Sequence, residues 1–412
     1  MNKENSGDPE VRVGSRAEGD RHFYSKLRPF VAALLALMLF VSLAGFLLML
    51  PAALSGHVDF RTFYTAGYLV RTGHGSAIHD YQRTMKFQNE LVSPAPVALP
   101  FFHLAYESLL YVPFSFLNYR QAYLAFLLCN LAFLFWTVKM MGPGLQGLRE
   151  VWPLLPVALP VCFLPVTMAL IEGQDSLLLL ALLVAAWVAT DRQKDFQAGA
   201  LVGLSLFKFQ YALPIALLYF LWRRWRFIEG FLLSAAVVAA VSVSLLGISG
   251  VTEFAHFLPG TSAKFSAAND VLLGIHPEGM ANLRGLVYVL SGGAPRFTNL
   301  VTILISAAAL AWAAFWRPTF PGAVLAAMLV SYHQMISDTT LLLLPLGYSM
   351  AQLLEGRCRA PRRALRWLVA FVAFIGPSLL LFAGTRFYLE ALPAMTLFAI
   401  FPRFLVQSPK EP

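Results

Sequence analysis

The chain contains little charge. Only 13% of its 412 residues are Asp, Glu, Lys or Arg, whereas 58% are hydrophobic. A soluble domain has about a quarter charged residues, so this composition excludes an ordinary soluble protein. Apolar runs of about 20 residues, long enough to cross a bilayer as helices, recur between residues 30 and 408. They are too long and too uniform for barrel strands, so we predict an all-α polytopic membrane protein.

The sequence also lacks the motifs of soluble enzymes. It has no P-loop, no GxSxG, no HExxH and no CxxC pair, so cytosolic nucleotide chemistry is unsupported. Its three cysteines (Cys129, Cys162 and Cys358) have no metal-like spacing and are expected to be packing residues. The net charge of +9 comes from loops between apolar runs, where Lys and Arg hold loops in the cytoplasm, so nucleic acid is not an expected partner.

Two arginine-rich loops set the predicted orientation. They are WRRWR at 222–226 and EGRCRAPRRALR at 355–366, and both are expected in the cytoplasm together with both chain ends. We predict about 12 transmembrane helices. Their approximate positions are 30–50, 101–117, 121–140, 152–171, 176–190, 198–221, 227–247, 298–316, 319–333, 339–353, 365–383 and 391–407.

The connections on the opposite, extracytoplasmic side are unequal. Residues 51–100 and 248–297 form two long loops, far longer than the 2 to 8 residues or so that join helices in a bundle. A short third connection is SYHQMISD at 331–338. Alternation places IEGQDS, 171–176, in the cytoplasm. If one span between 120 and 220 is instead a hairpin, this segment faces outward.

The first long loop begins with HVDFRTFYTAG, 57–67, directly after an apolar run. Its Asp59 lies just beyond the hydrocarbon boundary, close to Arg61 and Tyr64. A carboxylate at this depth can accept a proton from a hydroxyl group that approaches from water. Position alone favours a simpler role, in which Asp59 caps the next short helix.

Other polar residues stand at or within the apolar runs. His103 and Glu107 are four apart and share one face of a helix, either as functional groups or as an interfacial hydrogen bond. Lys208 falls near the middle of its predicted span, where pairing with Glu172 or Asp175 is favoured over a contact to phosphate.

The remaining candidates belong to the later external loops. His333 and Asp338 need a turn to meet, and alone they are a weak metal signature or simply solvated helix ends. Arg284 is suited to a bidentate phosphate contact, although it could be an ordinary surface arginine. All candidates except Lys208 map to the extracytoplasmic side.

Six blocks in this order resemble the GT-C membrane glycosyltransferases, specifically glycosyltransferase family 87, whose members are polyprenyl-phosphate mannosyltransferase-like. The resemblance covers about residues 30 to 350. The blocks are VDFRTFYTAGYLVRTGHGSAIHDY, PFFHLAYESLLYVPFSFLNYRQAYLAFLLCNL, EGQDSLLLLALLVAAW, AGALVGLSLFKFQYALPIALLYFLWRRWR, NLRGL and SYHQMISDTTLLLLPL. The chain departs from the family at HLA, 103–105, where many members have Tyr-Pro-Pro.

The resemblance implies an inverting hexosyltransferase of a bacterial inner membrane. Its donor would be a polyprenyl monophosphate sugar, with mannose as the expected sugar, and its acceptor a lipid or glycan on the extracytoplasmic face. Asp59 matches the family's first-loop aspartate and would be the general base. Arg284, and secondarily Lys208, would neutralise the departing phosphate, and His333 would hold that phosphate or orient the acceptor. Asp338 would bind sugar hydroxyls or support His333.

Further expectations complete this picture. Arg61 and Tyr64 would wall the donor site, and His103 with Glu107 would line the acceptor entrance. We expect no cofactor, and no obligatory metal because the sequence shows no cluster of carboxylates. Only lipids, the lipid-linked donor and the acceptor are expected as partners. Residues 1–28 are predicted to be a disordered cytoplasmic tail, 29–353 the GT-C-like catalytic module, and 354–412 a basic loop with C-terminal helices. The alternatives are a transporter or lipid flippase, although no internal repeat is visible, and a membrane acyltransferase with an intramembrane histidine.

Overall fold

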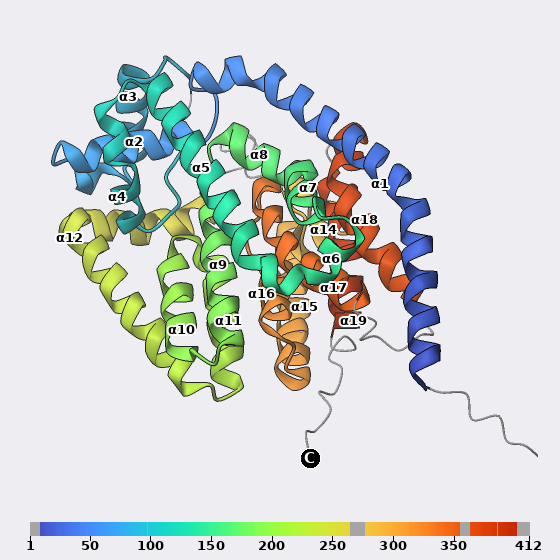
Figure 1. Cartoon of the computed structure of the whole chain (residues 1–412). Coiled ribbons are helices and arrows are strands. Elements are labelled where there is room, and N and C mark those ends of the chain that lie inside the picture. The colour runs from blue at the N-terminus through green and yellow to red at the C-terminus, as the bar shows by residue number, and fades with distance from the viewer. Residues whose placement is uncertain (1–8, 97, 264–276, 355–362, 385, 402–412) are drawn as a thin grey trace, which may run out of the picture.

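The computed structural model describes residues 9–96, 98–263, 277–354, 363–384 and 386–401. Within these ranges every regular element is a helix, which confirms the predicted all-α class (Figure 1). In chain order the α-helices are α1 (Pro9–Leu54), α2 (Phe60–Arg71), α3 (Tyr81–Leu91), α4 (Ser108–Tyr111), α5 (Tyr119–Met141), α6 (Gln146–Val151), α7 (Leu155–Cys162), α8 (Leu164–Glu172), α9 (Ser176–Asp191), α10 (Asp195–Leu204), α11 (Phe209–Leu221), α12 (Trp225–Ala263), α14 (Leu283–Leu290), α15 (Pro295–Trp316), α16 (Phe320–Val330), α17 (Leu343–Leu354), α18 (Arg363–Phe382) and α19 (Ala391–Ile400).

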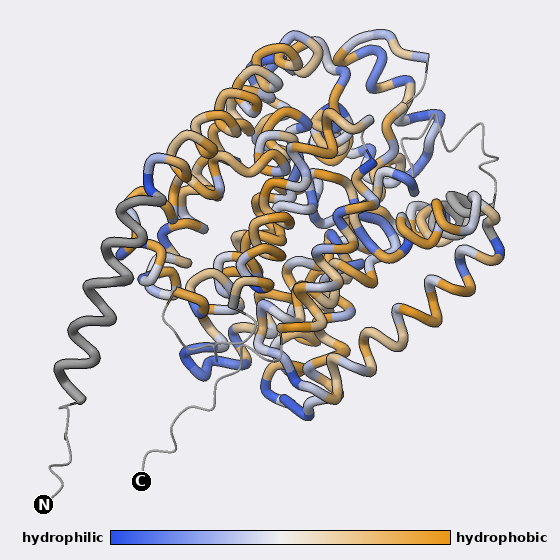
Figure 2. Tube along the Cα trace, turned by 90° about the vertical axis from the view of Figure 1, so that its right-hand side faces the viewer, coloured by the Kyte–Doolittle hydropathy of each residue, from blue (hydrophilic) through white to orange (hydrophobic). Residues whose placement is uncertain are grey.

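The chain is a membrane protein by the length and composition of its helices. Among the described residues, six helical stretches are long and apolar enough to span a bilayer. They are 28–54, 119–151, 195–221, 225–255, 296–316 and 364–382. The pair α7 and α8, bent by 58° at its break, makes a seventh if it is one span. The predicted count of about 12 spans is therefore not confirmed. Figure 2 shows the apolar colouring concentrated along the helices and the polar colouring gathered at turns.

One predicted span is wrong. Residues 101–117 form three short helices, Ala105–Glu107, Ser108–Tyr111 and Pro113–Phe116, in place of one crossing helix. Pro113 starts a new turn here because its ring cannot continue the preceding helix. The segment therefore belongs to the first long loop, which extends from the end of α1 to the start of α5.

Some boundary predictions concern residues at the edges of the described ranges. Helix α1 begins at Pro9, inside the segment 1–28 that was expected to be a tail, whereas residues 1–8 lie outside the described part. The basic loop 355–366 and the end of the last predicted span also fall largely outside it, as do residues 264–276 of the second long loop. Helices α18 and α19 contribute Phe374 and Phe398 to the same apolar core that contains Leu35 of α1.

Helices α10 and α11 form a hairpin, although together they read as one span. An ion pair between Arg224 Nη2 and Asp195 Oδ2, 2.7 Å apart, joins the start of α10 to the residues just after α11. Both ends of the hairpin therefore lie at one end of the bundle, and the 3₁₀ turn Ser205–Lys208 lies at the other. Lys208 is at the tip of a hairpin, so its predicted position in the middle of a span is corrected.

Close packing against α12 holds this hairpin in place. A Cβ atom on Gly199 would lie 1.8 Å from the carbonyl oxygen of Phe227, and one on Gly230 would lie 2.0 Å from that of Phe196. Small residues at such contacts let two helix backbones approach closely, which is how many membrane helices associate. Only glycine fits at either position, so the sequence specifies this crossing.

The first long loop folds into a layer that covers one end of the bundle (Figure 1). Helices α2, α3 and α4 form it around an aromatic cluster, in which the Phe60 ring stacks on Phe126 of α5 at 5.2 Å and Phe63 on Tyr111 at 4.9 Å. Helix α12 bends at Gly247, whose φ of +64° favours glycine, and then runs beneath this layer. Rigid aromatic packing therefore fixes Asp59, at the start of α2, relative to the bundle.

Candidate active site

The site is built around the joint between α8 and α9. Helix α8 ends at Glu172 and Gly173 adopts the left-handed conformation at φ +60°, a common way to terminate a helix. A Cβ atom there would also lie 2.6 Å from Cβ of Phe60. Both the backbone conformation and the close approach of Phe60 therefore require glycine at this position. The Tyr123 hydroxyl donates to the Ile171 carbonyl at 3.0 Å, and Asn130 Nδ2 donates to that of Gln174 at 3.1 Å. Helix α5 thus holds the sharp turn that presents Gln174 and the residue after it.

Asp59 meets this joint across the top of the bundle. It occupies the N-cap position of α2, but its side chain makes no capping hydrogen bond. Instead its Oδ2 accepts a hydrogen bond from Gln174 Nε2, and its backbone N–H donates to Glu172 Oε2 at 3.2 Å. The capping role that position alone favoured is therefore not what the carboxylate does. The carboxylate remains half-buried and faces the polar joint.

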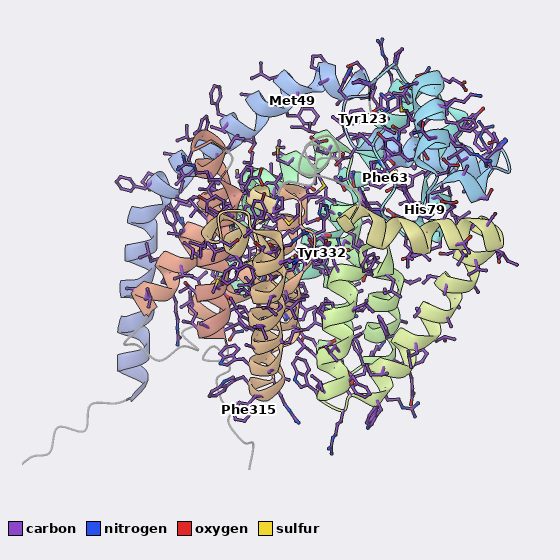
Figure 3. All side chains as sticks on the ribbon, turned by 180° about the vertical axis from the view of Figure 1, so that it is seen from behind. Met49, Phe63, His79, Tyr123, Phe315 and Tyr332 are labelled. Carbon is purple, nitrogen blue, oxygen red and sulfur yellow. The ribbon has the colours of Figure 1, made fainter. Side chains whose placement is uncertain are left out.

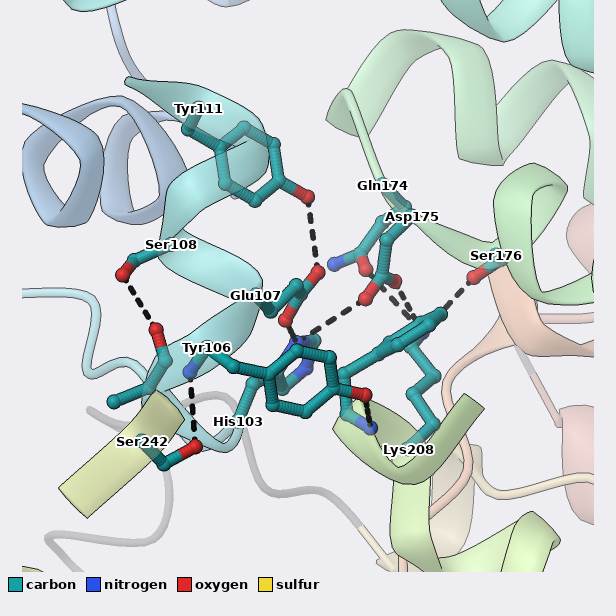
Figure 4. A network of polar contacts seen from close by, with 12 residues as sticks. His103, Tyr106, Glu107, Ser108, Tyr111, Gln174, Asp175, Ser176, Lys208 and Ser242 are labelled. Atoms are coloured by element: carbon teal, nitrogen blue, oxygen red, sulfur yellow. Dashed lines mark hydrogen bonds and ion pairs between the residues drawn. The ribbon is translucent and has the colours of Figure 1, made fainter. Parts of the chain in front are cut away.

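Lys208 projects from the hairpin tip into a fully buried ion network (Figure 4). Its Nζ lies 2.8 Å from Asp175 Oδ1, donates to Ser176 Oγ at 3.0 Å, and pairs with Asp338 Oδ1. It also reaches Gln174 Oε1 at 3.5 Å. The prediction that Lys208 pairs with Asp175 is confirmed. Its ammonium protons are taken up by Asp175, Asp338 and Ser176, so the structure favours the ion pair over the alternative of a phosphate contact.

Asp338 is equally occupied. Besides Lys208, its oxygens accept hydrogen bonds from Ser176 Oγ at 2.7 Å, Tyr211 Oη at 3.1 Å and the Met335 N–H at 3.2 Å. It is 1% exposed, which leaves no lone pair directed to an incoming sugar. The expectation that Asp338 binds sugar hydroxyls is therefore replaced by a role as the counter-ion of Lys208.

His103 and Glu107 come together as their spacing predicts. His103 Nδ1 lies 2.5 Å from Glu107 Oε2 and 3.1 Å from Asp175 Oδ2, and Tyr111 donates to Glu107 Oε1 at 3.1 Å (Figure 4). Burial lowers the pKa of His103, but the charges of Glu107 and Asp175 outweigh it and raise that pKa to about 10. Burial raises the pKa of Glu107 to about 7, opposed by His103. His103 is thus a cation at neutral pH, and the pair joins the Lys208 network through Asp175.

Asp59 has an altered acidity as well. Burial raises the pKa of its carboxyl group above the ordinary value. The hydrogen bond from Gln174 and the positive charges of Lys208 and His103 oppose that rise, because they stabilise the charged form. The carboxylate is therefore a stronger base than an exposed aspartate and still has a partner that keeps it ionised.

Two predicted wall residues have structural roles. Arg61 is 2% exposed, and its guanidinium donates to Gln88, Asn89, Ser93 and the Gly56 carbonyl, all within the first loop layer. The Tyr64 hydroxyl donates to the Leu117 carbonyl at 2.8 Å. The N–H and O–H groups of both residues are used in hydrogen bonds within the loop layer. Neither side chain is therefore free to line a site for the sugar donor.

Arg284 and His333 lie along the 331–338 loop. Arg284 donates from Nη1 to the Tyr332 carbonyl at 2.8 Å, and its guanidinium lies 4.0 Å from the centre of the exposed Tyr332 ring. His333 follows directly, with its ring 6.4 Å from that of Phe102. The same loop reaches the partner of Asp59, because Met335 Sδ lies 3.8 Å from Gln174 Nε2, which donates to the Asp59 carboxylate. The structure thus brings both residues to the end of the bundle that carries Asp59.

One group of side chains has metal-ligand chemistry. The ligand atoms of His103, Glu107 and Asp175 all lie within 4.8 Å of one another. The prediction of no obligatory metal assumed that no carboxylates cluster in this chain. That assumption is wrong. Lys208 already neutralises Asp175, and a metal would have to displace the proton that His103 holds. His103, Glu107 and Asp175 are the residues that could hold a cation.

Gln174 and Asp175 are central residues that were not among the predicted site residues. Asp175 entered only as one possible partner of Lys208, and Gln174 was not singled out. The sequence signal for them was the segment Gly-Gln-Asp between two apolar runs. Burying the Gln and Asp side chains there is energetically costly unless they have polar partners. The hairpin topology that places the triplet beside Asp59 was left open by the sequence.

The fold is that of a polytopic membrane protein, in which the loop layer that carries Asp59 covers a buried ion network at one end of the helical bundle. The chain belongs to glycosyltransferase family 87, which it matches over residues 107–345, more than half its length. This family makes it a glycosyltransferase and confirms the predicted resemblance. Asp59 and His103 precede the matched region, which includes Gln174, Lys208 and Asp338. No curated protein and no solved structure matches the chain.

Proposed function

We propose that the protein transfers a sugar, with mannose as the first candidate, from a polyprenyl monophosphate to a lipid or glycan hydroxyl. The observation that carries the proposal is the environment of Asp59. This carboxylate begins a helix without capping it, is half-buried, and is held by Gln174 at the end of the bundle where Arg284 and His333 also lie. The family supports sugar transfer, and an apolar, membrane-embedded chain supports a donor that stays in the bilayer.

The proposed reaction is a single displacement with inversion at the sugar C1. The acceptor oxygen forms the new bond to C1 as its proton passes to the Asp59 carboxylate. The C1–O bond to phosphate breaks, and the polyprenyl phosphate leaves with the electron pair. Phosphate is a good leaving group, so a nearby positive charge suffices and no proton donor is needed. Arg284 is the candidate for that charge, since Lys208 is committed to Asp175 and Asp338.

The other assignments follow from the same geometry. We propose that His333, which follows the residue whose carbonyl Arg284 holds, contacts the phosphate or the acceptor. His103 and Glu107 act on the site through Asp175, so we propose that they position the α8–α9 joint. A bacterial inner membrane, with the site on the extracytoplasmic face and both termini in the cytoplasm, remains our proposed location. We propose that no metal is obligatory.

Donor profiling tests the proposal directly. We expect purified, detergent-solubilised protein to transfer label from polyprenyl phosphate sugars to a lipid acceptor and to leave nucleotide sugars unused. Assays with EDTA should retain this activity, whereas loss of activity that a divalent cation restores would assign a metal to the His103 group. Vesicles that move the lipid-linked sugar across the bilayer without forming any transfer product would instead support a flippase.

The Gln174→Ala variant should change the pH dependence of transfer. Gln174 donates a hydrogen bond to the ionised form of Asp59 and so lowers the pKa of that carboxyl. Without this bond the pKa rises further, so the acid limb of the kcat/KM profile should move to higher pH, with activity still present above it. Gln334→Ala is the matched control, because Gln334 is buried nearby and donates to Thr339. Superimposable profiles for Gln174→Ala and wild type would exclude this role.

A further inference from the structure

An apolar groove opens beside Arg284 on the outer face of the bundle. It has a volume of about 260 Å³ and lies between α15, α16 and α19, with Leu283 of α14 at one end. Trp312 and Phe398, whose ring centres are 4.8 Å apart, close the other end. Its open side is bordered by Ile305, which is 37% exposed, and by the exposed Ala308. All of these side chains are apolar, and α15 is one of the helices that can span a bilayer.

The groove continues into the candidate site at its Leu283 end. The next residue is Arg284, and the groove residue Leu329 lies two positions before Ser331, which accepts a hydrogen bond from Asn282 Nδ2 at 3.0 Å. Arg284 stacks on Tyr332 and carries a buried Nε that has no hydrogen-bond partner among the described residues. A phosphate oxygen is a suitable acceptor for that unsatisfied group.

These features suit an amphiphilic ligand. Its anionic group would lie at the Leu283 end of the groove, and its hydrocarbon chain would extend from there along the groove. Seen from behind in Figure 3, α15 runs from the level of Tyr332 toward Phe315 at the opposite end of the bundle. The stretch from Ile305 to Trp312 covers about 10 Å along the helix, roughly a third of the hydrocarbon layer. The groove therefore takes the part of a lipid chain nearest its headgroup, and the remainder stays in the bilayer.

We propose that this groove binds the first isoprene units of the polyprenyl phosphate donor, with its phosphate on Arg284. The inference rests on the proposed function, because that function supplies an isoprenoid phosphate as substrate. It adds the site that selects the lipid chain, and it places the donor on the α14–α15–α19 side of the bundle. Acceptors then reach Asp59 from a different direction.

A bulky residue in the groove should remove the preference for long donors. We expect Ala308→Phe to lower kcat/KM for a long-chain polyprenyl phosphate sugar at least about tenfold, the effect of losing burial of about two methylene groups. For the donor with a single isoprene unit, kcat/KM should stay within about twofold of the wild-type value, because its short chain buries little apolar surface in the groove. Ala307→Phe is the control, because Ala307 is exposed on the same helix and does not line the groove. Equal losses with both donors, or no loss with either, would overturn the proposal.

A binding measurement separates the groove from the catalytic proposal. An isoprenyl phosphate that carries a diazirine in its second isoprene unit, without any sugar, should crosslink to peptides of α15 and α19 in the wild type. Ala308→Phe should reduce this crosslinking, and Ala307→Phe should leave it unchanged. If crosslinks spread evenly over all lipid-facing helices, the groove is not a specific site. If transfer fails with every donor while crosslinking remains, the proposed function is wrong and the lipid site stands.

Discussion

Replacing Asp59 with Asn should reduce kcat by about 10²- to 10⁴-fold, the usual contribution of a general base. An amide has nearly the shape of a carboxylate and its oxygen can still accept the hydrogen bond from Gln174, so the fold is preserved. It cannot take up the acceptor's proton at neutral pH, so only the proton-transfer step is lost. The measurement is single-donor kinetics at saturating acceptor, with thermal unfolding of both proteins as a check on folding.

Glu172→Gln is the matched control for this variant. Glu172 carries a neighbouring carboxylate, which accepts a hydrogen bond from the backbone N–H of Asp59 at 3.2 Å. We expect Glu172→Gln to retain most of the activity, because the neutral side chain can accept the same hydrogen bond. A large loss with Glu172→Gln together with near-normal Asp59→Asn kinetics would move the base to Glu172. Near-normal activity in both variants would exclude a base at this joint.

Lys208→Met should destabilise the folded protein by about 3–5 kcal/mol, because it leaves buried carboxylates without their cation. The ammonium pairs with Asp175 at 2.8 Å and with Asp338, and both carboxylates are fully buried. Methionine has a similar length and fills the same space, so the lost interaction is the charge. We expect a lower unfolding temperature in detergent and loss of transfer, since Gln174 also contacts Lys208.

A double variant distinguishes this structural role from a contact to the donor phosphate. Lys208→Met combined with Asp338→Asn removes one unpaired negative charge and should recover part of the lost stability, a coupling that a double-mutant cycle measures. Lys208→Arg should be intermediate, since it keeps the charge but not the compact ammonium. A Lys208→Met protein with wild-type stability and only a raised KM for the donor would show instead that Lys208 binds phosphate.

Several sequence predictions depended on local composition and survive in the structure. Low charge and long apolar runs specify membrane helices because unpaired backbone groups are excluded from lipid. The prediction that His103 and Glu107 meet is confirmed at 2.5 Å, although His103 precedes the short helix Ala105–Glu107 and does not share a helix face with Glu107. The order of motifs along the chain indicates glycosyltransferase family 87, and the match over residues 107–345 confirms it.

Other predictions failed where the answer depended on how distant segments meet. Arg61 and Asp338 read as ligand-binding residues because charged side chains near a membrane suggest function, but their partners come from other segments of the chain. Residues 198–221 were predicted to be one span because length and hydropathy do not reveal a reversal of direction. The Arg224–Asp195 ion pair shows that reversal, and it moves Lys208 to the end of the bundle that carries Asp59.

The sequence by itself therefore determined the class of protein, the family and the position of Asp59 just beyond the first membrane helix. These properties depend on composition, local spacing and the order of motifs along the chain. Only the tertiary structure decided that Gln174 holds Asp59, that Asp338 is a second counter-ion of Lys208, and that an apolar groove meets Arg284. Each of these is a contact between segments far apart in sequence, and such contacts depend on how whole helices pack against one another, which the spacing within one segment does not reveal.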